Sequence, residues 1–281
     1  MSLLKELIIL TVPEYIPVGL FGLLVGFVFS TNSLSVSLAL ILAIICVALV
    51  IAGYNSFNAI DDKEIDKINK PSRPLAKRTV TENQAFGASL TFFILAIIIG
   101  ATINVFFLSI IILSIIMAIA YSFPKIHLKR RFGLGTLSAT ILYTVLFPLA
   151  GWAIKPITAI PLFLIAYLFL FGLGVSMLKD FEDIIGDRRY GARTPAVVLG
   201  PGITLNIIYG FYIFSAILLI VLIFTNFLQV KYALVLLLTT PALLNSYTLR
   251  GDITARTSKK VFLYGIMMLM SVELLFMTLS L

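Results

Sequence analysis

The sequence contains very few of the residues that soluble enzymes use for redox and zinc chemistry. Its 281 residues include one cysteine, Cys46, and one histidine, His127. One cysteine excludes an internal disulfide, and this pair is too small for a zinc site of the usual Cys and His composition. Charged residues are also scarce, at 12% of the chain, whereas hydrophobic residues make up 60%. This composition is typical of a polytopic helical membrane protein and excludes a large soluble domain.

Long apolar runs alternate with short polar connections along the whole chain. A membrane-spanning helix needs about 20 apolar residues, and the first run lacks the cleavage pattern of a signal peptide. We therefore predict an all-α polytopic membrane protein with a single domain over residues 1–281 and pseudo-repeat halves of about 1–130 and 131–281. The nine predicted spans are residues 5–29, 35–58, 82–100, 103–122, 134–153, 158–179, 202–225, 230–249 and 259–280.

The basic residues predict the orientation of these spans. Every Lys and Arg except Lys155 and Lys231 lies near the N-terminus or in a connection that follows an even-numbered span. Because basic connections stay on the cytoplasmic side of a membrane, we expect a cytoplasmic N-terminus and an outside C-terminus. The same rule accounts for the net charge of +8, so the charge does not call for a nucleic-acid partner.

Two clusters of acidic residues each follow a predicted span on the same side of the membrane. The first lies within residues 61–66 and the second within 180–187. Both contain Asp-x-x-x-Asp, a spacing that places two carboxylates on one face of a helix, where they repel unless a cation lies between them. Mg²⁺ suits such ligands and leaves further positions for substrate phosphates. The sequence therefore predicts one site that binds a diphosphate. The spaced pairs are Asp62 with Asp66 and Asp183 with Asp187.

Three other ionisable residues have a position that bears on function. Arg73 lies between Pro71 and Pro74 just after the first acidic cluster, where its guanidinium could bind phosphate oxygens in a bidentate manner. Glu14 and Glu273 fall within predicted spans, and acids inside a membrane are functional candidates. Glu14 could help to orient or deprotonate an acceptor; the alternative is that it faces a polar cavity or pairs locally. His127, in a basic loop, is expected to take no part.

Three motifs in order along the chain resemble those of the UbiA superfamily of intramembrane prenyltransferases. The first is Asn58-x-x-x-Asp62-x-x-x-Asp66 followed by Asn69-Lys-Pro-Ser-Arg73-Pro74-Leu75. The second is Lys179-Asp180-x-x-Asp183-x-x-x-Asp187. The third is Tyr121-Ser122-x-Pro124-Lys125-x-x-x-Lys129-Arg130.

This resemblance implies nine transmembrane helices around a central cavity that opens sideways to lipid. It also implies a prenyltransferase in which two Mg²⁺ ions hold the diphosphate of an isoprenyl donor. The implied ligands of one ion are Asn58, Asp62 and Asp66, and those of the other are Asp180, Asp183 and Asp187. The implied diphosphate contacts are Arg73, Tyr121, Lys125 and Lys179.

The acceptor is less clearly implied than the donor. The Lys-Asp-x-x-Asp-x-x-Gly-Asp form of the second motif resembles enzymes that transfer a geranylgeranyl group to geranylgeranylglyceryl phosphate in archaeal lipid synthesis, and this acceptor is favoured. A quinone-ring precursor is the alternative hydrophobic acceptor. An alternative of another class is a membrane transporter of a cation or phosphate ester, which would place its acids at mid-membrane in broken helices.

Overall fold

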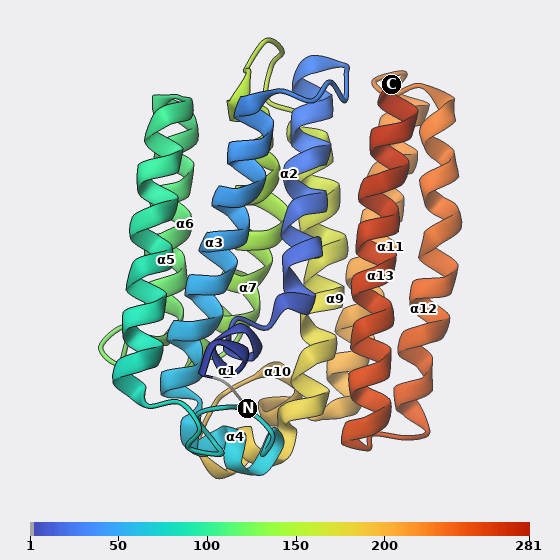
Figure 1. Ribbon diagram of the computed structural model, residues 1–281. Helices are drawn as coiled ribbons and strands as arrows, with labels where there is room; N and C mark the ends of the chain where they lie inside the picture. Colours follow the sequence, from blue (N-terminus) through green and yellow to red (C-terminus); the bar gives the residue numbers. More distant parts are fainter. Residues whose placement is uncertain (1–2) are drawn as a thin grey trace.

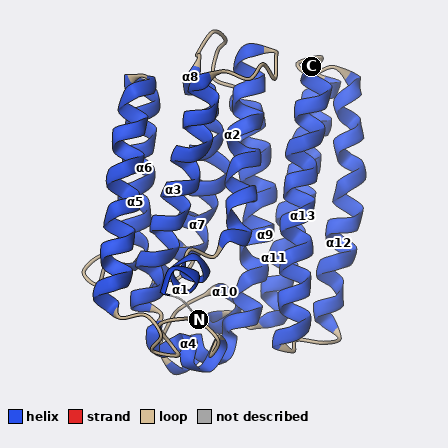
Figure 2. Cartoon of the chain, viewed as in Figure 1, coloured by secondary structure: helices blue, strands red, loops and turns tan. Residues whose placement is uncertain are grey.

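The computed structural model describes residues 3–281, and within them nine helical segments are long and apolar enough to cross a membrane (Figure 1). They run side by side, and Figure 2 shows no strand in this part of the chain. The predicted number of spans and the all-helical class are therefore confirmed. The segments are Leu3–Thr31, Leu38–Asp61, Glu82–Ile103, Val105–Ser122, Leu134–Ile154, Leu162–Arg189, Pro201–Phe224, Val230–Arg250 and Ala255–Ser280.

Several spans consist of more than one helical element. The elements of the first part are α1 (Leu3–Leu10), η1 (Pro13–Tyr15), α2 (Ile16–Thr31), α3 (Leu38–Asp61), α4 (Lys63–Asn69), α5 (Glu82–Ile103), α6 (Val105–Ser122), η2 (Leu128–Arg130), α7 (Leu134–Ile141), η3 (Leu142–Leu146) and α8 (Phe147–Ile154). Those of the second part are α9 (Leu162–Arg189), α10 (Pro195–Val198), α11 (Pro201–Phe224), η4 (Val230–Leu238), α12 (Thr239–Tyr247), η5 (Thr248–Arg250) and α13 (Ala255–Ser280).

Polar caps set the beginnings of helices that are otherwise apolar. Thr81 and Gln84 form a reciprocal capping box at the start of α5. The side chain of Asn104 accepts a hydrogen bond from the backbone N–H of Phe107 at the start of α6. These side chains satisfy N–H groups that have no partner within the helix. The short connection between α5 and α6 is thereby fixed at one residue.

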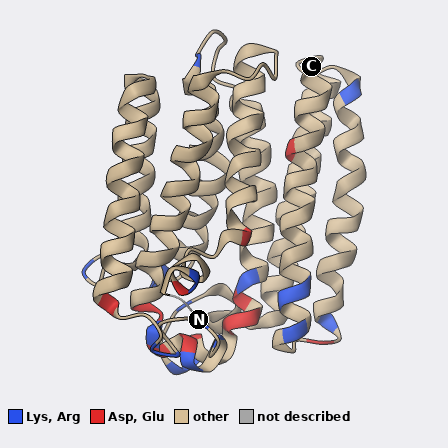
Figure 3. Ribbon diagram, viewed as in Figure 1, with Lys and Arg blue, Asp and Glu red and all other residues tan. Residues whose placement is uncertain are grey.

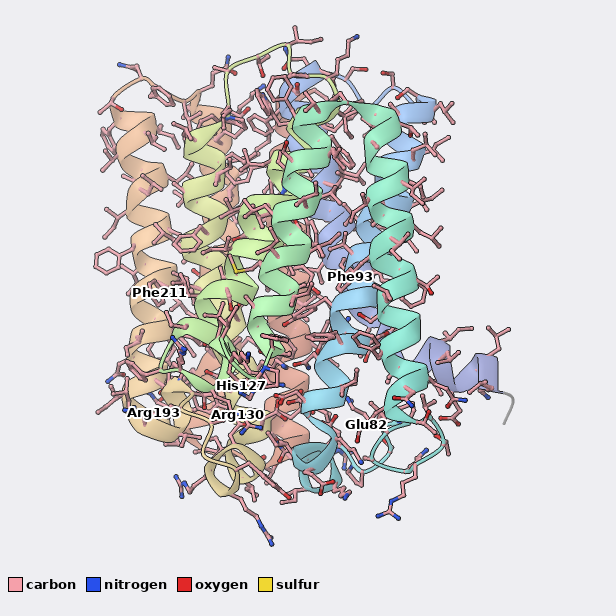
Figure 4. The ribbon with its side chains drawn as sticks, turned by 90° about the vertical axis from the view of Figure 1, so that its left-hand side faces the viewer. Glu82, Phe93, His127, Arg130, Arg193 and Phe211 are labelled. Carbon is pink, nitrogen blue, oxygen red and sulfur yellow. The ribbon has the colours of Figure 1, made fainter. Side chains whose placement is uncertain are left out.

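The first span is interrupted, which differs from the continuous helix predicted over residues 5–29. Pro13 cannot continue a helix because its nitrogen has no hydrogen to donate, and Val12 takes the left-handed conformation with φ of 49°. The short helix α1 consequently projects to the side of the bundle near its charged end, while α2 runs along the bundle (Figures 1 and 4). Glu14 therefore lies in the break, exposed, and not within a continuous span as the sequence suggested.

The core consists of two hydrophobic clusters that share α2. One cluster packs α3, α5, α6, η3 and α8 together, and the other packs α9, α11, η4, α12 and α13. Leu23 belongs to the first cluster and Val25 to the second, so opposite faces of α2 serve different clusters. The packing thus divides after α8, whereas the pseudo-repeat boundary near residues 130 and 131 stays a prediction about sequence.

Helices α2 and α8 approach each other so closely that their backbones touch. A Cβ atom on Gly26 would overlap the carbonyl oxygen of Pro148, and a Cβ atom on Gly151 would overlap that of Leu23. This contact requires glycine at both positions, because any side chain would have to displace the backbone of the neighbouring helix.

The charged residues gather at one end of the bundle, the end where α1 and α4 lie (Figure 3). The C-terminus lies at the opposite end. Both acidic clusters belong to the charged end, the first at the junction of α3 and α4 and the second on the last turns of α9.

We expect Gly151→Ala to destabilise the protein, because its methyl group meets the backbone of α2. Gly210→Ala is the matched control, since a Cβ atom there meets nothing within 4 Å. Overpacking costs about 1–3 kcal/mol, whereas alanine is favoured over glycine in a helix by about 1 kcal/mol. Thermal unfolding in detergent should show a lower Tm for Gly151→Ala and an unchanged or higher Tm for Gly210→Ala. Equal Tm values for both variants would contradict the backbone contact.

Candidate active site

A single asparagine joins the two acidic clusters. Asn69 ends α4, and its side-chain nitrogen donates to the carbonyl oxygen of Asp183 at 3.1 Å while its side-chain oxygen accepts from the N–H of Gly186 at 3.0 Å. Both partners lie on α9. A Cβ atom on Gly186 would be only 2.5 Å from this amide, so glycine allows the close approach. The clamp places the helix bearing Asp66 directly against the helix bearing Asp183.

The first carboxylate of the site, Asp62, is held by two neighbours. Asn58, one turn earlier on α3, donates to Asp62 at 2.7 Å, and the ammonium group of Lys129 lies 2.6 Å from it. Lys129 also donates to the side-chain oxygen of Asn58 at 2.9 Å. Burial alone would raise the pKa of Asp62, but Lys129 outweighs it and holds that pKa well below the ordinary value. Asp62 is therefore ionised, and Asn58 positions it.

Asp61 has a different environment although it precedes Asp62 directly. Its carboxylate lies 2.7 Å from both His127 and Lys129, and 3.7 Å from Arg130. Figure 4 shows His127 and Arg130 together at the charged end. Since three basic side chains surround Asp61, we interpret it as the anchor of the connection between α6 and α7. His127 thus contacts the acidic cluster through Asp61, and the expectation that it takes no part in function stays a prediction.

Two further ion pairs involve Asp66 and Asp183. Arg73 donates to Asp66 at 2.9 Å, and Lys70 lies 2.7 Å from Asp183. Burial opposes both charges, but the neighbouring carboxylates raise the pKa of Arg73 and of Lys70 above their ordinary values. For Asp66, burial dominates and raises the pKa of the carboxyl in spite of Arg73. Lys70 thus links the connection after α4 to α9, in addition to the Asn69 clamp.

These residues surround a polar cavity of about 50 Å³. Its side chains come from α4, α6, η2, α9 and the residues that adjoin them, and five of them are carboxylates. The carboxylates are Asp62, Asp66, Asp180, Asp183 and Asp187. The basic residues on its wall are Lys70, Lys129, Arg130 and Lys179.

Two ionisable side chains in this cavity have atoms without a partner among residues 3–281. The buried Oδ2 atom of Asp180 accepts no hydrogen bond from any described residue. Lys179, the residue before it, forms no hydrogen bond or ion pair with residues 3–281. An unpaired charge is costly in a buried position. The two groups are therefore suited to a ligand that brings both a cation and an anion.

A second, more apolar cavity of about 110 Å³ adjoins the polar one. Tyr121, Lys179 and Asp180 line both, so they mark the boundary. Four tyrosines and a phenylalanine supply most of its aromatic surface, and the π-helical turn η3 contributes one of them. The aromatic residues are Tyr15, Tyr54, Tyr121, Tyr143 and Phe262. We call this the aromatic cavity.

The donor set of the polar cavity fits Mg²⁺. Among the described residues, no three Cys, His, Asp or Glu side chains converge as a preformed metal site. Mg²⁺ does not require one, because it commonly takes one or two carboxylates and completes its coordination with water and substrate phosphates. The unpartnered oxygen of Asp180 is an available ligand, and the other four carboxylates line the same cavity.

The structure brings most of the predicted site residues together, with two exceptions. Lys125 is exposed and lines neither cavity. Lys129, four residues later in the same motif, forms an ion pair with Asp62. Glu14 lies on a separate cavity beside α1. Asn69, Lys70 and Lys129 were given no role from the sequence, although they stand within the quoted motifs. Glu273 is fully buried on α13, and neither of its oxygens has a partner in residues 3–281; nothing in the structure explains it.

The chain is similar to known proteins over nearly its whole length. It is 30% identical to a digeranylgeranylglyceryl phosphate synthase of Sulfurisphaera tokodaii over 261 residues, which cover 87% of this chain and 88% of that protein. It is 31% identical to the synthase of Methanosphaera stadtmanae, over 69% of this chain and 75% of that one.

Solved structures share the fold. A UbiA homolog from Archaeoglobus fulgidus bound to GPP and Mg²⁺ superposes with a TM-score of 0.80 and 18% identity, covering 98% of this chain and 99% of that one. A structure described as digeranylgeranylglyceryl phosphate synthase gives a TM-score of 0.72 and 24% identity over 100% of this chain and 99% of that one. The model of the UbiA prenyltransferase family matches residues 19–272. The chain therefore belongs to the UbiA prenyltransferase family and is an integral membrane prenyltransferase.

Proposed function

We propose that the protein transfers a geranylgeranyl group from its diphosphate to the free hydroxyl of geranylgeranylglyceryl phosphate, a step of archaeal ether-lipid synthesis. The observation that carries the proposal is the similarity to digeranylgeranylglyceryl phosphate synthases, which extends over 87% of the chain and includes both acidic clusters. The transporter alternative finds no support, because both clusters lie at helix ends and the chain belongs to a family of transferases.

The polar cavity is the proposed site of the donor diphosphate. A diphosphate alone would be repelled by the five carboxylates there, so it has to arrive with divalent cations. Related structures from Archaeoglobus fulgidus are described as bound to GPP or DMAPP together with Mg²⁺. We propose two Mg²⁺ ions, one on Asp62 and Asp66 and the other on Asp180, Asp183 and Asp187. When bound, Mg²⁺ would neutralise the charge that develops on the leaving diphosphate.

The basic side chains have complementary tasks in this proposal. Lys179 stands at the boundary of both cavities, where it can bind the diphosphate oxygen nearest the bond that breaks. Arg73 reaches the aromatic cavity and can bind phosphate oxygens with its planar group once it releases Asp66. Lys129 and Asn58 hold Asp62 in place. The predicted diphosphate contact at Lys125 is replaced in the proposal by Lys129 acting through Asp62.

The aromatic cavity is the proposed site of the prenyl chain. In the transfer, the allylic carbon–oxygen bond of the donor breaks, the diphosphate leaves, and an ether bond forms to the acceptor oxygen, whose proton passes to a base. The electron-rich faces of Tyr54, Tyr121 and Tyr143 can stabilise the positive charge on the allylic carbon. Their apolar surroundings exclude water that would otherwise capture this carbon.

The charged end of the bundle is proposed to face the cytoplasm of the cell. Lys5 on α1 lies at that end, and Leu281 ends the chain at the other (Figure 1). In a Cys46→Ala background, a membrane-impermeant thiol reagent applied outside intact cells should label Leu281→Cys and spare Lys5→Cys, because basic connections stay inside. Both sites labelling from outside would refute the proposed orientation.

Incubation with a panel of acceptors tests the function directly. The purified protein, Mg²⁺ and geranylgeranyl diphosphate should convert geranylgeranylglyceryl phosphate to a product that carries a second ether-linked chain, identified by mass spectrometry. The panel includes aromatic quinone-ring precursors. Prenylation of an aromatic acceptor without conversion of the glyceryl phosphate would replace the proposal by the quinone alternative.

Lys129 and Lys125 form a matched pair of variants. We expect Lys129→Met to lower kcat/KM for the donor roughly ten- to hundredfold, because Asp62 loses a hydrogen bond between charged groups that is worth about 1.5–3 kcal/mol. Lys125→Met, which changes an exposed side chain, should stay within about threefold of the wild type. Size-exclusion profiles establish that both variants are folded. A folded Lys129→Met enzyme with wild-type kinetics, or a stronger loss in Lys125→Met, would contradict this assignment.

A further inference from the structure

A third cavity opens beside the site, between α1, the connection after α4, and the beginning of α13. Its volume is about 280 Å³, larger than the aromatic cavity. The two cavities share Tyr15, Arg73 and Phe262 on their walls. A molecule in the third cavity therefore lies next to the aromatic cavity, with these three side chains at the boundary. We call it the α1 cavity.

One wall of the α1 cavity is apolar and open to the surroundings. Ile8 on α1 is 52% exposed, Ile9 is 39% exposed, and Leu263 on α13 is 37% exposed. Helix α1 projects to the side of the bundle near its charged end (Figures 1 and 4), which is the orientation of a helix at a membrane interface. Lipid chains would therefore reach this wall from the side, while the opposite part of the cavity stays near the polar head groups.

The other wall is charged, and only some of its basic residues already form ion pairs. Lys70 is paired with Asp183 and Arg73 with Asp66. Lys259, in the first turns of α13, lines the cavity but forms no ion pair with any residue in 3–281. Its neighbour Lys260 is also exposed but does not line the cavity. The positive-inside rule explains Lys260 without further function, whereas Lys259 has a specific place.

The wall also contains two carboxylates, Glu14 and Glu182. They would repel a simple anion such as free phosphate, so the cavity is not a general anion site. A ligand that combines one anionic group with a hydroxyl suits it better, because a carboxylate accepts a hydrogen bond from a hydroxyl. Glu14 precedes Tyr15, which the two cavities share, so a hydroxyl at Glu14 would lie near the boundary with the aromatic cavity.

We propose that the α1 cavity binds the acceptor and that its ligand is a phosphate-bearing glycerol lipid with one free hydroxyl. The phosphate binds Lys259, the hydrocarbon chain lies against Ile8, Ile9 and Leu263, and the free hydroxyl donates to Glu14. The identity of this lipid rests on the proposed function, but the binding site rests on the cavity and on the position of Lys259. The lipid would enter sideways from the membrane and present its hydroxyl to the aromatic cavity.

The test compares Lys259→Ala with Lys260→Ala, two variants that remove the same charge one residue apart on one helix. Steady-state kinetics are measured with geranylgeranylglyceryl phosphate and with its dephosphorylated glycerol ether, the latter as a competitive inhibitor if its turnover is too slow. We expect Lys259→Ala to raise the KM for the phosphorylated acceptor roughly tenfold or more and to leave the donor KM unchanged. Affinity for the dephosphorylated ether should not change, and Lys259→Arg should retain most of the phosphate affinity.

The outcomes separate the two proposals. If the wild type forms no product from the glyceryl phosphate, the proposed function fails, and this acceptor assignment fails with it. If the wild type forms the product but Lys259→Ala and Lys260→Ala have the same acceptor KM, the function stands and the α1 cavity is overturned as the phosphate site. An equal loss of affinity for the phosphorylated and dephosphorylated acceptors in Lys259→Ala would also overturn the phosphate contact.

Discussion

The arrangement depends on bringing two clusters of negative charge against each other at the edge of a membrane. Five carboxylates around one small cavity repel one another strongly in surroundings of low polarity. The Asn69 clamp overcomes this repulsion with hydrogen bonds to the backbone of α9, which carry no charge and persist whatever occupies the cavity. The basic side chains then reduce the repulsion, and Lys70 and Lys129 come from connections rather than from the two helices themselves.

Because the Asn69 clamp is separate from the ion pairs, the basic partners of the carboxylates can be replaced by a substrate and its cations. The amide of Asn69 fixes the distance between α4 and α9, so the carboxylates need not keep their present basic partners to stay in place. Arg73 can turn from Asp66 toward a phosphate, and divalent cations can take over the neutralisation of the carboxylates. A site held together by its ion pairs alone would come apart when a substrate competed for them.

The sequence predicted the fold and the location of the site better than the contacts within it. Apolar runs of sufficient length define membrane spans on their own, and the basic residues locate the charged end, so nine helices and the meeting of two clusters were predictable. The choice between Lys125 and Lys129 was not. His127 adopts a left-handed conformation with φ of 50°, and the short helix η2 follows it, which turns Lys129 inward and leaves Lys125 outside. Sequence spacing alone does not show this turn.

The position of Glu14 was missed for a related reason. Composition marked residues 5–29 as one apolar run, and Pro13 decided the geometry by breaking the helix there. Because the break turns α1 sideways, Glu14 lies on the wall of a cavity at the interface instead of among packed helices. The unpaired state of Lys179 and the clamp of Asn69 likewise depend on which helices become neighbours, and local patterns do not contain that information.

The glycine contact between α2 and α8 has a consequence for how a long prenyl chain can be admitted. Where two helix backbones touch, no side chain can rotate to make room. The contact between α2 and α8 is therefore a rigid seam within the bundle. The seam residues do not line the aromatic cavity, whereas Phe262, Ile266 and Leu269 of α13 do, and their side chains can rotate. A prenyl chain that needs more room therefore has to gain it from such side chains and not from a separation of α2 and α8.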